Sequence, residues 1–123
     1  MKKFLLTLIL LGFVFVFASD ITKGSNINNS DKTFIYLYLD NCKYCKDFDK
    51  NYKKLEKKYN KMCNFSKIPV MSKEGMAISY KFGINSAPFV LIFDNKTNKV
   101  TSIDQRCLMN YSCLEGNFKD IIK

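Results

Sequence analysis

Cysteine is the residue type of this chain whose spacing points most directly to chemistry. Five Cys stand among 123 residues, and two of them form the sequence Cys42-Lys43-Tyr44-Cys45. At the start of a helix such cysteines lie one turn apart, close enough to form a disulfide. The free N–H groups and the dipole of the helix would stabilise a thiolate on Cys42, and Lys43 adds a positive charge beside it. The motif therefore predicts a redox pair in which Cys42 reacts first and Cys45 resolves the mixed disulfide.

The rest of the composition excludes several other chemistries. The chain has no His, so Ser-His-Asp and Cys-His nucleophiles and imidazole metal ligands are excluded. Its five Gly are too scattered for a phosphate loop or a dinucleotide-binding turn. The net charge of +9 comes almost entirely from Lys, and Arg106 is the only Arg. Because specific nucleic-acid recognition relies on Arg, we expect a solvated lysine surface, no nucleic-acid partner and no cofactor.

Two other interpretations of the Cys42–Cys45 motif stay open. The pair could be half of a zinc site completed by Cys107 and Cys113, although five residues between two ligands suit structural zinc poorly. It could also be a purely structural bridge, although so short a loop gives little stabilisation. We therefore predict no bound metal.

The N-terminal residues have the pattern of an export signal. Met1-Lys2-Lys3 is positive, Phe4–Ala18 is an uncharged apolar run, and small residues precede Ser19. We expect a signal peptide at residues 1–18, a polar linker at residues 19–32 and one domain at residues 33–123. The domain would then be periplasmic, where disulfides persist. The alternative is an uncleaved segment that anchors the chain to the inner membrane.

Apolar periodicity predicts an α/β domain with the order β-α-β-α-β-β-α. Apolar residues at steps of four and three residues predict the first helix, for which Asp40 or Asn41 would be the cap. Ser72 would cap the second helix, and Gly83 would end it. The expected strands are Thr33–Leu39, Asn64–Val70, Phe89–Phe93 and Lys99–Asp104, and the expected helices are Lys43–Asn60, 73–82 and about Gly116 to the end. Together they predict a four-stranded mixed sheet flanked by helices.

This order of motifs resembles the thioredoxin superfamily. The resemblance lies in the strand, the C-x-x-C motif, the helix, and then residues 81–93, KFGINSAPFVLIF. It implies a minimal thioredoxin-like fold, Cys42 as the exposed nucleophile and Cys45 as the buried resolving thiol. It further implies that Pro88 is a cis-proline that faces them, with Ala87 before it. We expect Lys43, Tyr44, Ala87 and Pro88 to contact the substrate.

The sequence departs from the common thioredoxin pattern near the cysteines. Asn41 replaces the usual Trp, and Tyr36 stands where cytoplasmic thioredoxins carry a buried Asp. The dipeptide Lys43-Tyr44 resembles that of exported thioredoxin-related proteins and disulfide isomerases in its aromatic residue. We expect a monomeric thiol–disulfide oxidoreductase that acts on client proteins, with reduction favoured and a membrane partner that recycles it. The alternative is a thioredoxin-fold binding or assembly module that holds a client or copper without turnover.

The three remaining cysteines are assigned from topology. Cys107 follows the predicted fourth strand, which ends at the same sheet edge as the first, so residues 107–113 should form a loop that flanks Cys42. Cys107 and Cys113 are close in sequence, and we predict a structural disulfide between them; the alternatives are a second redox pair or a lip that selects clients. We expect Cys63 to lie at the far end of the sheet as a partly buried thiol outside both pairs.

Overall fold

A computed structural model describes residues 31–123, which form a four-stranded sheet between helices. The predicted signal peptide and nearly all of the predicted linker lie outside the described residues. The strands are β1 Lys32–Tyr38, β2 Asn64–Pro69, β3 Phe89–Asp94 and β4 Lys99–Ser102. The helices are α2 Lys43–Tyr59, α3 Lys73–Phe82, α4 Gln105–Leu108 and α5 Tyr111–Ile122.

The sheet has the strand order β2-β1-β3-β4. β1 is parallel to β2 and antiparallel to β3, and β4 is antiparallel to β3. The mixed sheet therefore matches the prediction, with the apolar β1 in its interior. β1 begins at Lys32, one residue inside the predicted linker, because Lys32 pairs with Asp94 in the sheet.

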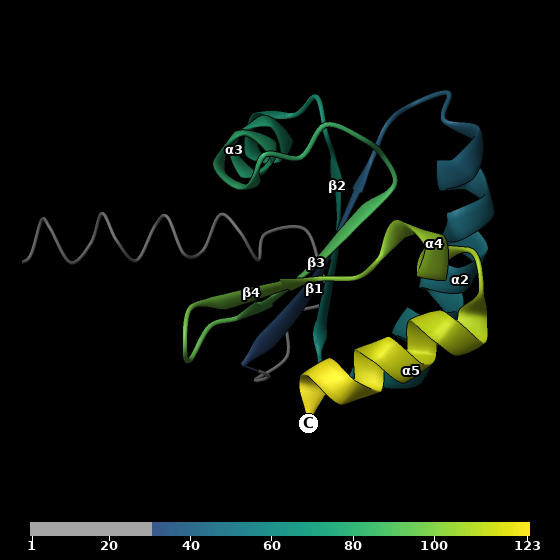
Figure 1. The fold of residues 1–123 in the computed structure, drawn as a ribbon, viewed down its shortest axis with the longest axis vertical. Coiled ribbons are helices and arrows are strands. Elements are labelled where there is room, and N and C mark those ends of the chain that lie inside the picture. The colour runs from purple at the N-terminus through teal and green to yellow at the C-terminus, as the bar shows by residue number, and fades with distance from the viewer. Residues whose placement is uncertain (1–30) are drawn as a thin grey trace, which may run out of the picture.

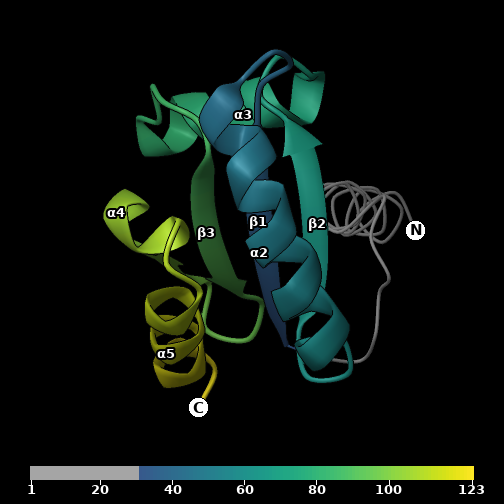
Figure 2. The same ribbon diagram turned by 90° about the vertical axis from the view of Figure 1, so that its right-hand side faces the viewer.

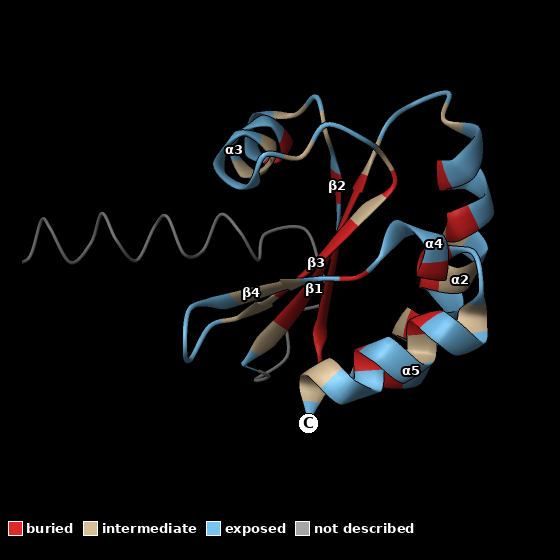
Figure 3. Ribbon diagram, viewed as in Figure 1, coloured by how far each residue is buried: buried red, intermediate tan, exposed pale blue. Residues whose placement is uncertain are grey.

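The helices cover the two faces of the sheet unequally. α2, α4 and α5 lie on one face and α3 lies on the other (Figures 1 and 2). The side chains of β1 contribute to the core on both faces of the sheet, because successive side chains of a strand point to opposite faces. Phe34 and Tyr36 pack into the core under α2 and α5, whereas Ile35 and Leu37 pack under α3. Figure 3 shows that buried residues follow the sheet and the inward sides of α2 and α5, while α3 is mostly exposed.

α3 is short and is fixed by its ends. The side chain of Ser72 caps it by accepting a hydrogen bond from the Gly75 N–H at 3.0 Å, and Gly83 ends it with a φ of 64°. Gly75 lies against the end of β2, where an added Cβ would meet the Pro69 carbonyl oxygen at 1.9 Å. The close approach of α3 to β2 therefore requires glycine at position 75.

The C-terminal region differs from the prediction. The last helix begins at Tyr111, five residues earlier than expected, because the side chain of Asn110 caps it by accepting from the Cys113 N–H at 3.1 Å. β4 ends at Ser102, and Asp104 caps the short helix α4, which the sequence did not predict. No helix within residues 31–123 has both the length and the apolar character needed to cross a bilayer.

Candidate active site

The two cysteines of the C-x-x-C motif stand at the N-terminal end of α2. The Cys42 sulfur accepts a hydrogen bond from the Cys45 N–H at 3.1 Å. The two residues are joined in a disulfide with a Cα–Cα distance of 5.1 Å. Cys42 is half-buried, whereas Cys45 is 4% exposed and faces the core. An incoming thiol or disulfide can therefore reach Cys42 more readily than Cys45.

The prediction that Asp40 or Asn41 caps α2 is wrong, because Cys42 is itself the N-cap residue. Asn41 adopts a φ of 59°, a left-handed conformation that Asn tolerates well, and this turn brings the next residue to the cap position. The first turn of α2 contains no acidic residue. The reacting sulfur thus lies directly over the positive end of the helix dipole, without a carboxylate in that turn.

A second segment, Ser86–Pro88, approaches Cys42 from the start of β3. The Cys42 sulfur lies 3.8 Å from the Ala87 carbonyl oxygen, and the Ala87–Pro88 peptide bond is cis. Pro88 itself is buried. The Gln105 side-chain amide is within 2.9 Å of both the Pro88 carbonyl oxygen and the Ser86 hydroxyl. Gln105 therefore holds this segment in place beside Cys42.

The two residues between the cysteines lie at the surface. Lys43 is exposed, and the Tyr44 side chain is 64% exposed although it is a large apolar ring. Of the predicted site residues, the structure therefore brings Cys42, Cys45, Ala87 and Pro88 together. Lys43 and Tyr44 lie at the protein surface next to them.

A polar network lies beneath the buried cysteine. The Tyr36 hydroxyl lies 2.9 Å from the Cys45 carbonyl oxygen and 2.9 Å from Oδ1 of Asp49, and either oxygen can accept its hydrogen bond. Lys67 on β2 forms an ion pair with Asp49 at 3.2 Å. Burial, followed by the hydrogen bond to Asp49, raises the pKa of Tyr36 well above its usual range. Tyr36 therefore stays a neutral phenol that ties the first turn of α2 to the sheet.

The second cysteine pair lies on the same face of the sheet, at the start of α5. Cys107 and Cys113 are joined in a disulfide with a Cα–Cα distance of 5.2 Å, the pairing predicted from sequence. The expectation of a loop at residues 107–113 is wrong, because these residues include the end of α4 and the first turn of α5.

The position of this segment relative to the active site is also only partly as expected. Gln105 reaches Pro88, so the segment begins beside the active site. The Leu108 carbonyl accepts a hydrogen bond from Asn51, which lies about two turns along α2 from Cys45. The second disulfide therefore lies farther along α2 than the prediction implies.

Cys63 takes part in neither disulfide. It precedes β2, and its side chain is fully buried rather than partly buried as expected. The sulfur lies within 3.5 Å of the carbonyl oxygens of Lys32 and Asn64. Burial raises the pKa of Cys63 to about 12, so its thiol stays protonated at neutral pH.

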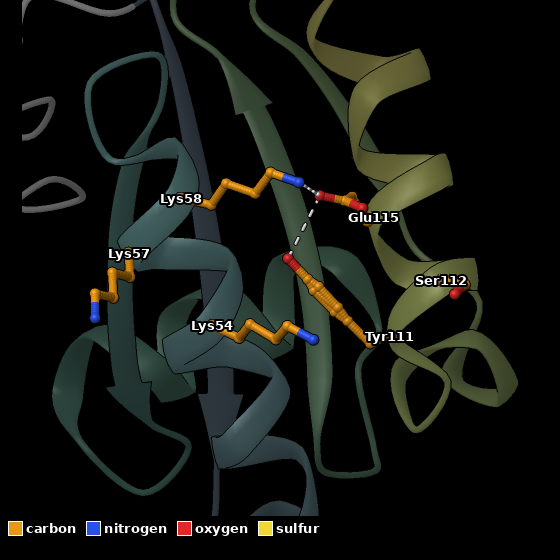
Figure 4. A pocket seen from close by; sticks show the side chains of 6 residues that line it. All are labelled: Lys54, Lys57, Lys58, Tyr111, Ser112 and Glu115. Carbon is orange, nitrogen blue, oxygen red and sulfur yellow. Dashed lines mark hydrogen bonds and ion pairs between the residues drawn. The ribbon is translucent and has the colours of Figure 1, made fainter.

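A shallow surface pocket between α2 and α5 lies away from the reactive cysteines. Figure 4 shows its lining residues, which are Lys54, Lys57, Lys58, Tyr111, Ser112 and Glu115. Glu115 pairs with Lys58 at 2.6 Å and accepts from the Tyr111 hydroxyl at 3.5 Å, and the Lys54 ammonium lies 4.2 Å from the Tyr111 ring centroid. These contacts join the two helices. Within residues 31–123 no group of three Cys, Asp or Glu side chains is placed to hold a metal ion.

Two residues that support the site, Asp49 and Gln105, were not predicted from the sequence. Asp49 follows Cys45 by four residues, a helical spacing that places both on one side of α2, so this signal was present. The contact of Gln105 with Pro88 spans 17 residues and has no local signal.

The comparisons with known proteins agree with this geometry. The thioredoxin family model matches residues 16–110. No curated protein matches the sequence.

Solved structures resemble the chain at low sequence identity. The J-Trx1 fragment of ERdj5 matches with a TM-score of 0.63 at 14% identity, over 78% of this chain and 44% of that one. The first thioredoxin domain of mouse protein disulfide-isomerase A4 matches with a TM-score of 0.62 at 16% identity, over 76% of this chain and 64% of that one. Mitochondrial thioredoxin 3 from Saccharomyces cerevisiae matches with a TM-score of 0.62 at 21% identity, over 86% of this chain and 89% of that one.

The chain thus spans less than half of the ERdj5 fragment and less than two thirds of the disulfide-isomerase structure. At these identities the structures show a shared fold. The family match covers most of the chain, and the Cys42–Cys45 pair lies at disulfide distance within the matched residues. The chain therefore belongs to the thioredoxin family.

Proposed function

We propose that this protein is a thiol–disulfide oxidoreductase that exchanges disulfides with cysteine-containing client proteins in the periplasm, mainly in the reducing direction. The observation that carries the proposal is the position of the Cys42 sulfur. It lies at the N-terminus of α2, 3.1 Å from the Cys45 N–H and 3.8 Å from the Ala87 carbonyl oxygen. A reactive sulfur is thus placed beside a backbone segment that a client can bind.

The reaction uses the two cysteines in turn. The Cys42 thiolate attacks one sulfur of a client disulfide, and the other client sulfur leaves as a thiolate that takes a proton from solvent. Cys45 then loses its proton and attacks the Cys42 sulfur of the mixed disulfide. This step forms the Cys42–Cys45 bond and releases the second client sulfur as a thiolate. Two electrons pass from the enzyme to the client.

The helix supports the thiolate of Cys42. The Cys45 N–H already donates to this sulfur in the disulfide form, and the first turn of α2 has no acidic residue. A negative charge on the sulfur would be stabilised by this N–H group and by the helix dipole. Cys45 is 4% exposed and is protected from outside reagents until the mixed disulfide forms next to it.

The neighbours of Cys42 provide the client-binding surface. The Ala87 residue before the cis peptide bond is half-buried, and its carbonyl oxygen faces the Cys42 sulfur. An extended client segment can form main-chain hydrogen bonds with this backbone, as in other proteins that bind a peptide by adding it as a strand. Tyr44 and Lys43, both exposed, would contact the client residues on either side of its cysteine.

The reducing direction is supported by the modest number of donors on the sulfur. Strongly oxidising pairs owe their potential to a stabilised reduced form. Among residues 31–123, the Cys42 sulfur accepts one backbone N–H hydrogen bond, from Cys45. A single donor favours a potential nearer that of thioredoxin, about −270 mV, than that of a strong oxidant, about −120 mV.

The periplasmic location is supported by the signal-like residues 1–18, and a reductase there needs a membrane partner to restore its thiols. Cell fractionation and N-terminal sequencing of the mature protein test the location. We expect a periplasmic protein that begins at Ser19, and retention of Met1 in the membrane fraction would favour the anchored form.

The activity is tested by insulin reduction with dithiothreitol. The wild type should accelerate it, and equilibration with glutathione should give a potential near the reducing value. A potential near −120 mV would contradict the proposed direction and leave the exchange chemistry intact.

A further inference from the structure

The second disulfide has the same asymmetry of access as the first. Cys107, on α4, is 4% exposed and belongs to the core, whereas Cys113 is exposed in the first turn of α5. From this arrangement we infer that the Cys107–Cys113 bond is a second exchange site, at which a small thiol such as glutathione attacks Cys113. This inference does not depend on the function of Cys42 and Cys45. The family match ends at residue 110, before Cys113.

The reaction at this site moves two electrons. A small thiolate attacks the Cys113 sulfur, the Cys107–Cys113 bond breaks, and Cys107 leaves as a thiolate that then takes a proton. Cys113 now carries the small thiol as a mixed disulfide. A second small thiolate attacks the sulfur of the bound molecule, so that the two small thiols form a disulfide and Cys113 is released reduced.

The Asn117 side chain places a hydrogen-bond donor next to the sulfur of Cys107, which is the leaving group. The Asn117 amide nitrogen lies 3.1 Å from the Cys107 sulfur and 3.7 Å from the Cys113 sulfur. Its contact with the Cys113 carbonyl at 2.9 Å orients the amide. Hydrogen bonds to a charged acceptor are about twice as strong as neutral ones, so this donor stabilises the Cys107 thiolate more than the disulfide. A bond with a purely structural role gains little from such a donor.

The attacked sulfur also sits at a favourable place on its helix. Cys113 is in the first turn of α5, a helix of 12 residues whose first turn has no acidic residue. The N–H of Cys113 is already bound by the Asn110 side chain at 3.1 Å. The positive end of the helix dipole would stabilise a thiolate on Cys113 once the bond opens.

The fold around this disulfide is held by other contacts. Asp104 caps α4 and Asn110 caps α5. Asn51 on α2 donates to the Leu108 carbonyl at 2.8 Å, and Leu108 and Leu114 are fully buried. Because these contacts fix both ends of the bridge, the bond can open and close without unfolding the domain.

The surroundings of Cys113 favour a small thiol over a protein client. Cys113 lies in the first turn of a helix, where the carbonyl groups accept hydrogen bonds within the helix, and its own carbonyl also accepts from the Asn117 side chain. An extended client strand therefore has no carbonyl there to pair with, whereas Ala87 offers one beside Cys42. A small thiol needs only access to the sulfur.

The first test uses mixed-disulfide formation in a background with Cys42→Ser and Cys45→Ser. Two proteins are compared after incubation with oxidised glutathione and acid quenching, one with Cys107→Ser and one with Cys113→Ser. Intact mass should show one glutathione on the Cys107→Ser protein, at Cys113. The matched Cys113→Ser protein should show none, because Cys107 and Cys63 are buried. Equal labelling of the two proteins, or none in either, would overturn the inference.

The second test leaves the bridge intact and so does not rely on the folding of those variants. The protein with Cys42→Ser and Cys45→Ser is treated with reduced glutathione without denaturant, and thiols are trapped by alkylation at intervals. We expect Cys113 to become alkylated while the buried Cys107 and Cys63 stay protected and the circular dichroism is unchanged. Asn117→Ala should slow the reduction about tenfold. Reduction only after unfolding by urea, or an unchanged rate in Asn117→Ala, would contradict the site described here.

Discussion

The two disulfides of this domain have similar bonds in different surroundings. Their Cα–Cα distances are 5.1 and 5.2 Å, and each joins one accessible sulfur to one that is 4% exposed. Cys42 faces the Ala87 carbonyl oxygen at the end of the sheet, whereas Cys113 stands on the outer side of a helix. On the functions proposed here, an accessible sulfur is enough for exchange with a small thiol, and exchange with protein clients also needs a backbone surface beside the sulfur.

The strongest test of this comparison removes the accessible sulfur of each pair in turn. Cys42→Ser should lower insulin reduction to the rate of dithiothreitol alone, because serine without a neighbouring base is a poor nucleophile and the chain has no His. Cys113→Ser should keep the wild-type rate within about twofold, because the proposed client surface is at Ala87 and not at α5. A large loss in Cys113→Ser would show that the two sites are not separate.

The second prediction concerns stability. Replacing Cys107 and Cys113 together by Ser should lower the free energy of unfolding by about 2 kcal/mol, because the bridge closes a short loop in the unfolded chain. Urea unfolding of the variant and of the oxidised wild type measures the difference. A cooperative transition should remain, since the caps at Asp104 and Asn110 are unchanged. Loss of cooperative unfolding would mean that the bond is required for the fold.

The third prediction tests the client surface beside Cys42. Tyr44→Ala should raise the KM for a protein client about fivefold, because an exposed aromatic ring at an interface contributes on the order of 1 kcal/mol. Its reaction with oxidised glutathione should be unchanged. Tyr80→Ala is the matched control, since Tyr80 is 92% exposed on α3, on the other face of the sheet from α2 and α5 (Figure 2). Equal effects of the two substitutions would contradict a binding role for Tyr44.

The smallest expected effect is at Gln105. Gln105→Ala removes the contacts that hold Ser86 and Pro88 at 2.9 Å, so Ala87 should be less well placed for the client. We expect the KM for a protein client to rise about threefold, because neutral hydrogen bonds contribute only a small net free energy. The rate with oxidised glutathione should not change. A loss of both activities would instead show that Gln105 supports Cys42 directly.

Much of the fold followed from local patterns in the sequence. β1 was predicted from its apolar run, and the alternation of Phe34 and Tyr36 with Ile35 and Leu37 explains both layers of the core. The spacing of apolar residues in α2 predicted its buried side and its length to within one residue. These features depend on neighbours within a few residues, which periodicity describes well.

The errors lie where short segments depend on capping or on distant contacts. α4 has four residues, too few for an apolar period to be visible, and it forms because Asp104 caps it. The start of α5 depends on the Asn110 cap and on the disulfide at Cys113, neither of which an apolar period describes. The network of Tyr36, Asp49 and Lys67 joins two strands to a helix, so no local pattern contains it.

The measurement that tests the central claim most directly is the mapping of a trapped client complex. The Cys45→Ala protein retains the Cys42 thiol and lacks the thiol that would release the client, so mixed disulfides should accumulate. Peptide mass analysis should place the client cysteine on Cys42. A client cysteine on Cys113, or the absence of any thiol-dependent adduct, would contradict the assignment of client exchange to Cys42.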